Sequence, residues 1–134
     1  MEDSMILYKL NKLMDKAIKK DEVPVAALIV YKNKIIASAY NKTKKKNNIL
    51  NHAEILVIKK ASKKLNNWRL SDCSLYVTLE PCDMCKEIIK KSRIKEVIYY
   101  SKQNKYKTEN EPNYLFNHNK FFSSKLSNFF KLKR

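Results

Sequence analysis

The spacing of apolar residues changes along the chain, and it predicts which segments are helices and which are strands. Between Ser4 and Lys20 apolar residues recur every three or four positions, at Ile6, Leu10, Leu13, Met14, Ala17 and Ile18. This is the stripe of an amphipathic helix. Val25–Val30 is instead a short continuous apolar run after Pro24, which predicts a buried strand. Ile35–Tyr40 follows a predicted turn and is expected to be its hairpin partner.

The remaining segments alternate between helix and strand. In chain order they are a helix from Ala53 to about Leu65, a strand at Leu75–Leu79, a helix at Cys82–Lys91, a strand at Glu96–Tyr100, an irregular polar loop at Ser101–Asn119 and a helix over about 121–134. Helices between strands predict a three-layer α/β/α fold, with a central mixed sheet of four to five strands and helices on both faces. No repeat or linker divides the chain, so 1–134 is predicted to be a single domain.

The composition excludes several classes of protein. A hydrophobic fraction of 44% with regular spacing excludes a disordered chain, and no apolar run is long enough for a membrane span. The first residues, Met1, Glu2 and Asp3, do not resemble a secretion signal, so we expect a cytoplasmic protein. Three cysteines, two of them in a C-x-x-C pair, favour metal or redox chemistry over disulfides in such a protein.

The net charge points to an acidic partner without identifying it. The chain carries 29 Lys and Arg against 13 Asp and Glu, a net charge of +16, and nucleic acid is the first candidate partner. However, the absence of glycine and the abundance of Lys, Asn and Ile are typical of an AT-rich coding bias. Part of the charge therefore has no functional meaning.

Two short patterns place metal-binding side chains where helices are predicted to begin. Glu54 follows His52 by two residues, and Cys82 and Cys85 come directly after Pro81. A helix N-terminus favours thiolates, and one histidine with two cysteines forms a set of three soft ligands for zinc. Three protein ligands leave one position open for water, which is the arrangement of a catalytic zinc. Glu54 beside such a water is placed to act as a general acid and base.

A structural zinc site is the alternative interpretation of this cluster. Cys73 or His118 would then supply a fourth ligand and the metal would only stabilise the fold, which leaves the position of Glu54 unexplained. We interpret Cys73 as a small buried hydrophobic residue. We interpret His118 as a solvated histidine in the polar loop, with a substrate contact as the alternative.

Longer stretches of the sequence resemble the bacterial tRNA-specific adenosine deaminases, the TadA family, which have the cytidine deaminase-like fold. The zinc motif is common to that whole superfamily. The run from Leu75 to Cys85 and the C-terminal Phe-Phe-basic segment are more specific to the tRNA enzymes. Other stretches that resemble the family are Glu22–Val25, Asn41, Trp68–Leu70, Ser92–Ile94 and Leu126–Arg134.

The resemblance implies a zinc-dependent hydrolase that converts adenosine to inosine at the wobble position of a tRNA anticodon, expected to be that of an arginine tRNA. It implies a homodimer, the anticodon stem-loop as partner and no organic cofactor. Asn41 is expected to hydrogen-bond the flipped base, and Val25 to line the substrate site. The remaining implied roles are one zinc per chain on His52, Cys82 and Cys85, and proton transfer by Glu54.

Two regions depart from the family pattern. The stretch Lys102–Asn104 lacks the acidic residue that contacts the anticodon in the family. The segment before the last helix is short, so the fifth strand is expected to be missing or rudimentary. Both differences concern recognition of the RNA and leave the reaction type unchanged.

Cations and aromatic residues are the candidates for RNA contacts, since cations neutralise phosphates and aromatic rings stack on unpaired bases. The C-terminal candidates are Phe129, Phe130, Lys131, Lys133 and Arg134. The others are Lys44, Lys45, Lys46, Lys102, Lys105, Tyr106, Lys107 and Phe121. Any one of these lysines can equally be a solvated residue, and Phe129 or Phe130 can belong to the core.

Two further functions remain open at this point. A deaminase of a free base or nucleoside, such as guanine or cytosine, would share the zinc motif but have no use for a basic tail. A non-enzymatic RNA-binding module would use zinc to hold its fold. Removal of the metal distinguishes this RNA-binding module from an enzyme: a structural zinc is needed for folding, so the module should unfold without it.

Overall fold

The computed structural model describes residues 2–44, 47–103 and 113–132. The elements of these residues, in chain order, are α1 (Asp3–Lys19), β1 (Ala26–Tyr31), β2 (Lys34–Tyr40), α2 (Ala53–Leu65), β3 (Cys73–Val77), α3 (Asp83–Lys91), β4 (Glu96–Tyr99), β5 (Tyr114–Phe116) and α4 (Lys120–Leu132). The helix and strand types follow the order predicted from the apolar spacing.

The strands form one mixed sheet in the order β2-β1-β3-β4-β5. Strand β1 pairs antiparallel with β2 and β3, whereas β3 pairs parallel with β4, and β4 with β5. The β1–β2 hairpin turns at Lys32 and Asn33, whose φ angles are 48° and 63°. A two-residue turn of this kind needs positive φ at both positions, which glycine usually supplies. In a chain without glycine, Asn33 here and Asn66 at the end of α2 adopt this conformation instead.

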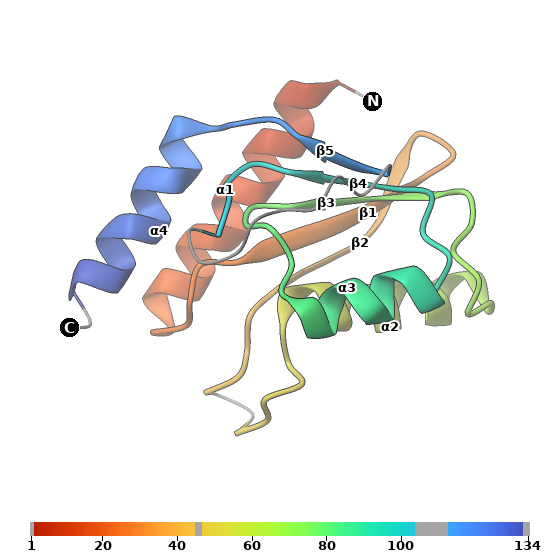
Figure 1. Cartoon of the computed structure of the whole chain (residues 1–134), viewed down its shortest axis with the longest axis horizontal. Coiled ribbons are helices and arrows are strands. Elements are labelled where there is room, and N and C mark those ends of the chain that lie inside the picture. The colour runs from red at the N-terminus through yellow and green to blue at the C-terminus, as the bar shows by residue number, and fades with distance from the viewer. Residues whose placement is uncertain (1, 45–46, 104–112, 133–134) are drawn as a thin grey trace.

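Helices cover both faces of the sheet. Ala26 to Ile29 of β1 are fully buried at every position, which a strand shows only when both of its faces are covered. Figure 1 shows α2 and α3 on one face and α4 beside α1 on the other. Lys125 of α4 bonds to Asn11 and Asp15 of α1, which ties these two helices together. The three-layer α/β/α fold is therefore confirmed, and none of the described helices is long and apolar enough to cross a bilayer.

Three boundaries differ from the prediction. Strand β3 ends at Val77 because Thr78 turns its hydroxyl to the Ala26 N–H group, at 3.0 Å. Cys82 has an extended backbone and precedes α3, so it is not the first residue of that helix. Tyr114–Phe116, predicted as loop, forms the three-residue strand β5 through parallel pairing with β4, so the fifth strand is present and short.

Candidate active site

The ends of four strands meet at one edge of the sheet. Ala26 at the start of β1 pairs with Tyr40 at the end of β2. Ala27 pairs with Val77 at the end of β3, and Val77 pairs with Tyr99 at the end of β4. Helices α2 and α3 begin just beyond this edge, at residues 53 and 83. Segments that are distant in sequence therefore converge here, as they do at the binding sites of open α/β sheets.

The three predicted metal ligands come together at this edge. His52 and Cys82 are the residues immediately before α2 and α3, and Cys85 lies in the first turn of α3. The Nδ1 atom of His52 is 3.5 Å from the Sγ atom of Cys85 and 3.9 Å from that of Cys82, and the three ligand atoms lie within 4.8 Å of one another. Tetrahedral zinc, with bonds of about 2.1 Å to nitrogen and 2.3 Å to sulfur, needs such separations. The group is therefore compatible with zinc.

Glu54 is buried beside this group. It is 4% exposed, and its Oε1 atom is buried without a hydrogen-bond partner among the described residues. Burial raises the pKa of Glu54 to about 7, although its own backbone N–H group and the Cys85 side chain partly oppose this. A carboxyl group with such a pKa both accepts and releases a proton near neutral pH. Its unsatisfied acceptor needs a donor, which a water in the site would provide.

The pKa shifts of His52 and Cys85 have opposite effects on cation binding. Burial lowers the pKa of His52, which keeps the imidazole in the neutral form that binds metals. Burial, and then the nearby Glu54 charge, raise the pKa of the Cys85 thiol well above its ordinary value. Burial and the Glu54 charge therefore oppose the effect that the N-terminus of α3 has on this thiol. A divalent cation bound here would lower the pKa of the Cys85 thiol, because coordinated thiols lose their proton.

The residues considered as a fourth ligand lie elsewhere. Cys73 begins β3, at the end of the strand remote from the site, and is 1% exposed, as expected for a small core residue. His118 follows β5, where its ring contacts Phe116 and its Nε2 atom is 3.5 Å from the Ser123 hydroxyl. Within the described part of the chain the metal-binding group therefore has three protein ligands. This matches the open arrangement of a catalytic metal.

A pocket of about 240 Å³ opens onto the group. It is lined by Val23, Val25, Asn41, Thr43, His52, Glu54, Leu79, Glu80, Cys82 and Gln103. The Asn41 Oδ1 atom accepts the Ala53 N–H group at 2.8 Å, which fixes the start of α2 and leaves the Asn41 NH₂ group as a donor for the pocket. The predicted substrate residues Asn41 and Val25 thus lie beside the predicted ligands, in a space that suits a single planar base.

Five residues that line the pocket were not predicted as site residues: Val23, Thr43, Leu79, Glu80 and Gln103. Glu80 is 4% exposed, and its Oε1 atom accepts the Gln103 N–H group at 3.3 Å, while its carbonyl accepts the Gln103 side-chain amide at 2.8 Å. These bonds join the segments after β3 and β4. Glu22, which is 1% exposed, holds the segment after β2 by accepting bonds from Thr43 and Lys44. Glu80 stands directly before the Pro81-Cys82 pair, and Glu22 begins the Glu22–Val25 stretch that resembles the family, but no pattern marks Gln103 as a site residue.

None of the predicted RNA contacts among the described residues lines this pocket. Phe129 is 9% exposed and belongs to the buried side of α4, whereas Phe130 and Lys131 are exposed. Lys44 and Lys102 are the nearest candidates along the chain, directly after Thr43 and directly before Gln103. The candidates Lys45, Lys46, Lys105, Tyr106, Lys107, Lys133 and Arg134 lie outside the described residues. The RNA contacts therefore stay predictions.

A three-layer fold with a His/Cys/Cys group at two helix starts and a buried glutamate beside it defines a protein of the cytidine deaminase-like class. The sequence matches the MafB19-like deaminases over residues 1–134. It is 45% identical over 97 residues to the tRNA-specific adenosine deaminase of Rickettsia bellii, which covers 71% of this chain and 67% of that protein. The chain belongs to the MafB19-like deaminase family, and its sequence is similar to that of tRNA-specific adenosine deaminases.

Solved structures agree on the fold. One of these structures comes from studies of A-to-I editing by tRNA:A34 deaminases at the wobble position of transfer RNA. Its TM-score is 0.75 and its sequence identity 29%, and the match covers 87% of this chain and all of that chain. A guanine deaminase from Bacillus subtilis has a TM-score of 0.71 and 26% identity, over 99% and 94% of the two chains. The fold alone therefore does not separate an RNA substrate from a free base.

Further relatives named tRNA-specific adenosine deaminase match over 56 to 64% of their own lengths, so the matched segment spans less than two thirds of them.

Proposed function

We propose that this protein catalyses the hydrolytic deamination of adenosine to inosine at the wobble position of a tRNA anticodon. The observation that carries the proposal is the buried Glu54 carboxyl, with its unsatisfied Oε1 atom, beside three metal ligands in a pocket of base size. We also propose that His52, Cys82 and Cys85 hold one zinc ion per chain. A bound zinc would supply the activation of the attacking water.

The chain's own residues then account for positioning and proton transfer. The attacking water forms the new C6–O bond of the base, and the C6–N bond to ammonia breaks. Glu54 takes one proton from the water and delivers it to N1. It then takes the second proton from the new C6 hydroxyl and delivers it to the leaving amine, which its pKa near 7 allows. The Asn41 NH₂ group donates to an acceptor of the base, and Val25 excludes water from one wall. The net reaction consumes one water and releases one ammonia.

The tRNA substrate is supported over a free base by the relatives. Those called tRNA-specific adenosine deaminase are 35 to 46% identical to this chain over 84 residues or more. Among the solved structures, the tRNA:A34 deaminase is 29% identical and the guanine deaminase 26%. The net charge of +16 also suits a polyanionic substrate. An arginine tRNA, a homodimer and a place in the compartment that holds tRNA stay predictions from the family resemblance.

The proposed function is tested by incubating the purified protein with an anticodon stem-loop that carries a wobble adenosine. We expect inosine to form, and free adenosine, guanine and cytidine to react far more slowly, because only the stem-loop adds contacts outside the pocket to the binding of one base. Digestion of the RNA and chromatography of its nucleosides measure the product. Turnover of free guanine or cytidine at a rate above that of the stem-loop would assign the protein to the free-base deaminases.

The basic tail gives a second test of the substrate. Replacing Lys131, Lys133 and Arg134 together by Ala should weaken stem-loop binding, and the slope of log affinity against log salt should become shallower by up to about 0.7 for each lost single-strand phosphate contact. Zinc content and the unfolding temperature should barely change, because exposed cations contribute little to stability. An unchanged slope together with unchanged inosine formation would show that these cations only keep the end of the chain solvated.

A further inference from the structure

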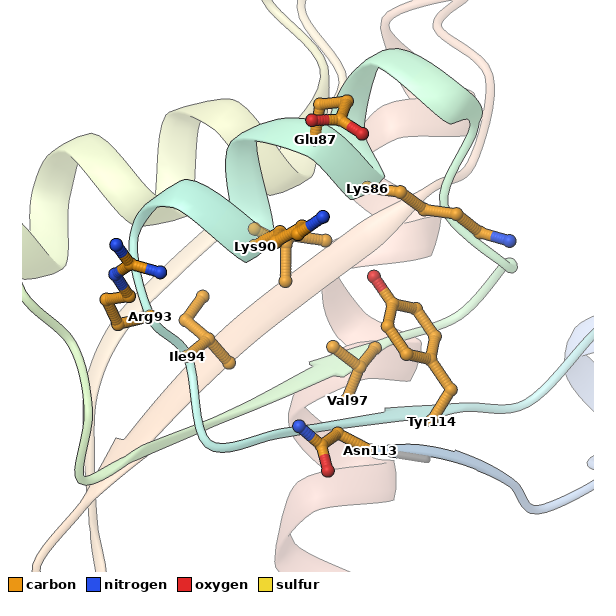
Figure 2. A pocket seen from close by; sticks show the side chains of 9 residues that line it. Lys86, Glu87, Lys90, Arg93, Ile94, Val97, Asn113 and Tyr114 are labelled. Carbon is orange, nitrogen blue, oxygen red and sulfur yellow. The ribbon is translucent and has the colours of Figure 1, made fainter. Parts of the chain in front are cut away.

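A second hollow, separate from the pocket at the metal ligands, lies between α3 and strands β4 and β5 (Figure 2). This α3–β5 groove has a volume of about 550 Å³. Its floor is apolar, because Ile89, Ile94 and Val97 are all at least nine-tenths buried beneath it. None of the residues that line it takes part in the reaction proposed above.

Cations dominate the rim of the α3–β5 groove. Lys86 and Lys90 lie one helical turn apart on α3, Arg93 follows the end of that helix, and Glu87 is the one acidic residue among the lining side chains. Figure 2 shows Lys90 and Arg93 along the rim, with Lys86 and Tyr114 at the same end of the groove. Lys90 and Arg93 are exposed and form no ion pair with any described residue. Positive charge over an apolar floor is complementary to an anion that also has a flat apolar part.

An aromatic row continues from the groove toward the edge that carries the site. The Lys86 Nζ atom lies 5.6 Å from the centre of the Tyr114 ring, and Tyr114 is followed by Tyr99 and Phe116, with ring centres 6.5 and 5.2 Å apart in turn. Lys102 places its Nζ atom 4.8 Å from the centre of the Phe116 ring, and Phe116 is 41% exposed. Tyr99 is buried, and Phe116 is the exposed ring of this row. A cation beside an accessible ring, as Lys102 is beside Phe116, is typical of surfaces that bind single-stranded nucleic acid.

The groove and the active-site pocket adjoin each other. The Nζ atom of Lys86, which lines the groove, is 3.4 Å from the Oε2 atom of Glu80, which lines the pocket. At the other end of the row, Lys102 directly precedes Gln103, which also lines the pocket. A strand whose base enters the pocket therefore has the groove directly beside it, with the exposed cations Lys90 and Arg93 further along.

We propose that the α3–β5 groove binds the RNA strand next to the deaminated nucleotide. Lys90 and Arg93 contact its phosphates, and Phe116 stacks on an unpaired base. Charge complementarity selects this occupant: Lys86 is paired with Glu80, but Lys90 and Arg93 still leave the rim positive beside Glu87, and a second copy of a chain with a net charge of +16 would bring more positive charge to it. This inference rests on the proposed RNA substrate.

The test uses the double variant Lys90→Ala/Arg93→Ala in the full chain, with the anticodon stem-loop as probe. Its matched control is Lys63→Ala/Lys64→Ala, which removes two equally exposed cations from α2. Loss of two phosphate contacts should raise the stem-loop Kd and KM roughly tenfold at 0.1 M salt and make the salt slope shallower by about 0.7 per contact. At saturating RNA kcat should stay within about twofold of wild type, because the reacting groups are untouched. The control should bind and react as wild type.

Each other outcome has a definite meaning. If wild type forms inosine while the double variant keeps the wild-type Kd, KM and salt slope, the groove does not bind the substrate and the proposal is overturned. If sedimentation shows that only the groove variant loses a dimer, the groove is a subunit contact, which also overturns it. If wild type forms no inosine but the groove variant alone loses stem-loop affinity, the proposed reaction fails and the RNA-binding groove stands.

Discussion

Replacing Glu54 by Gln is expected to lower the rate of inosine formation by about 10²- to 10⁴-fold, the usual contribution of a positioned general acid and base. The substitution keeps the shape of the side chain and removes the group that accepts the proton. Burial raises the pKa of the native carboxyl to about 7, so this position disfavours a charge. A neutral amide buries no charge there, and the fold should therefore be retained. Single-turnover rates at saturating stem-loop measure the effect.

The control for this variant is Glu2→Gln, which makes the same chemical change at an exposed position before α1. Both variants should keep the zinc content, the circular dichroism and the stem-loop affinity of wild type. Only Glu54→Gln should lose turnover. A Glu54→Gln protein that reacts at nearly the wild-type rate would mean that another group moves the proton, and the assigned role of Glu54 would be wrong.

The fold was largely predictable because its long elements each carry one clear signal. The apolar stripe of α1 and the apolar run of β1 have the two periods that distinguish helix from buried strand. Strand β5 was not predictable, because three residues are too few to show a period and their partners in β4 lie some 17 positions earlier in the chain. The end of β3 at Val77 depends on the contact between Thr78 and Ala26, which only the assembled sheet creates.

The metal ligands and Glu54 were predictable because they belong to two short sequence motifs at helix starts. The remainder of the pocket depends on which strand ends meet. Gln103 reaches the site because β4 lies beside β3, and its two bonds to Glu80 join segments 23 residues apart. For a similar reason the motif shows the helix N-terminus at Cys85 but not the burial and the Glu54 charge that raise the pKa of its thiol.

Removing the metal is expected to stop inosine formation completely while the domain stays folded. The three ligands lie at the edge of the sheet, whereas the fully buried side chains of Leu10, Met14, Leu28, Val57 and Leu75 form a core between the layers. Chelation removes only the binding energy of the metal and leaves that core in place, so a lower unfolding temperature is expected but not unfolding at about 25 °C. Metal analysis, circular dichroism and rescue of activity by added zinc measure the three effects.

Two cysteine variants locate the metal without a chelator. Cys85→Ala removes a ligand and should lose both zinc and turnover, whereas Cys73→Ala removes an equally buried thiol remote from the group and should keep one zinc per chain. Cys73→Ala still leaves a small cavity, so its unfolding temperature should fall while its activity at about 25 °C stays close to wild type. Unfolding of the wild-type chain on chelation would instead indicate a structural zinc and a non-enzymatic RNA-binding module. Loss of zinc from Cys73→Ala would make Cys73 a ligand and close the position that the reaction requires.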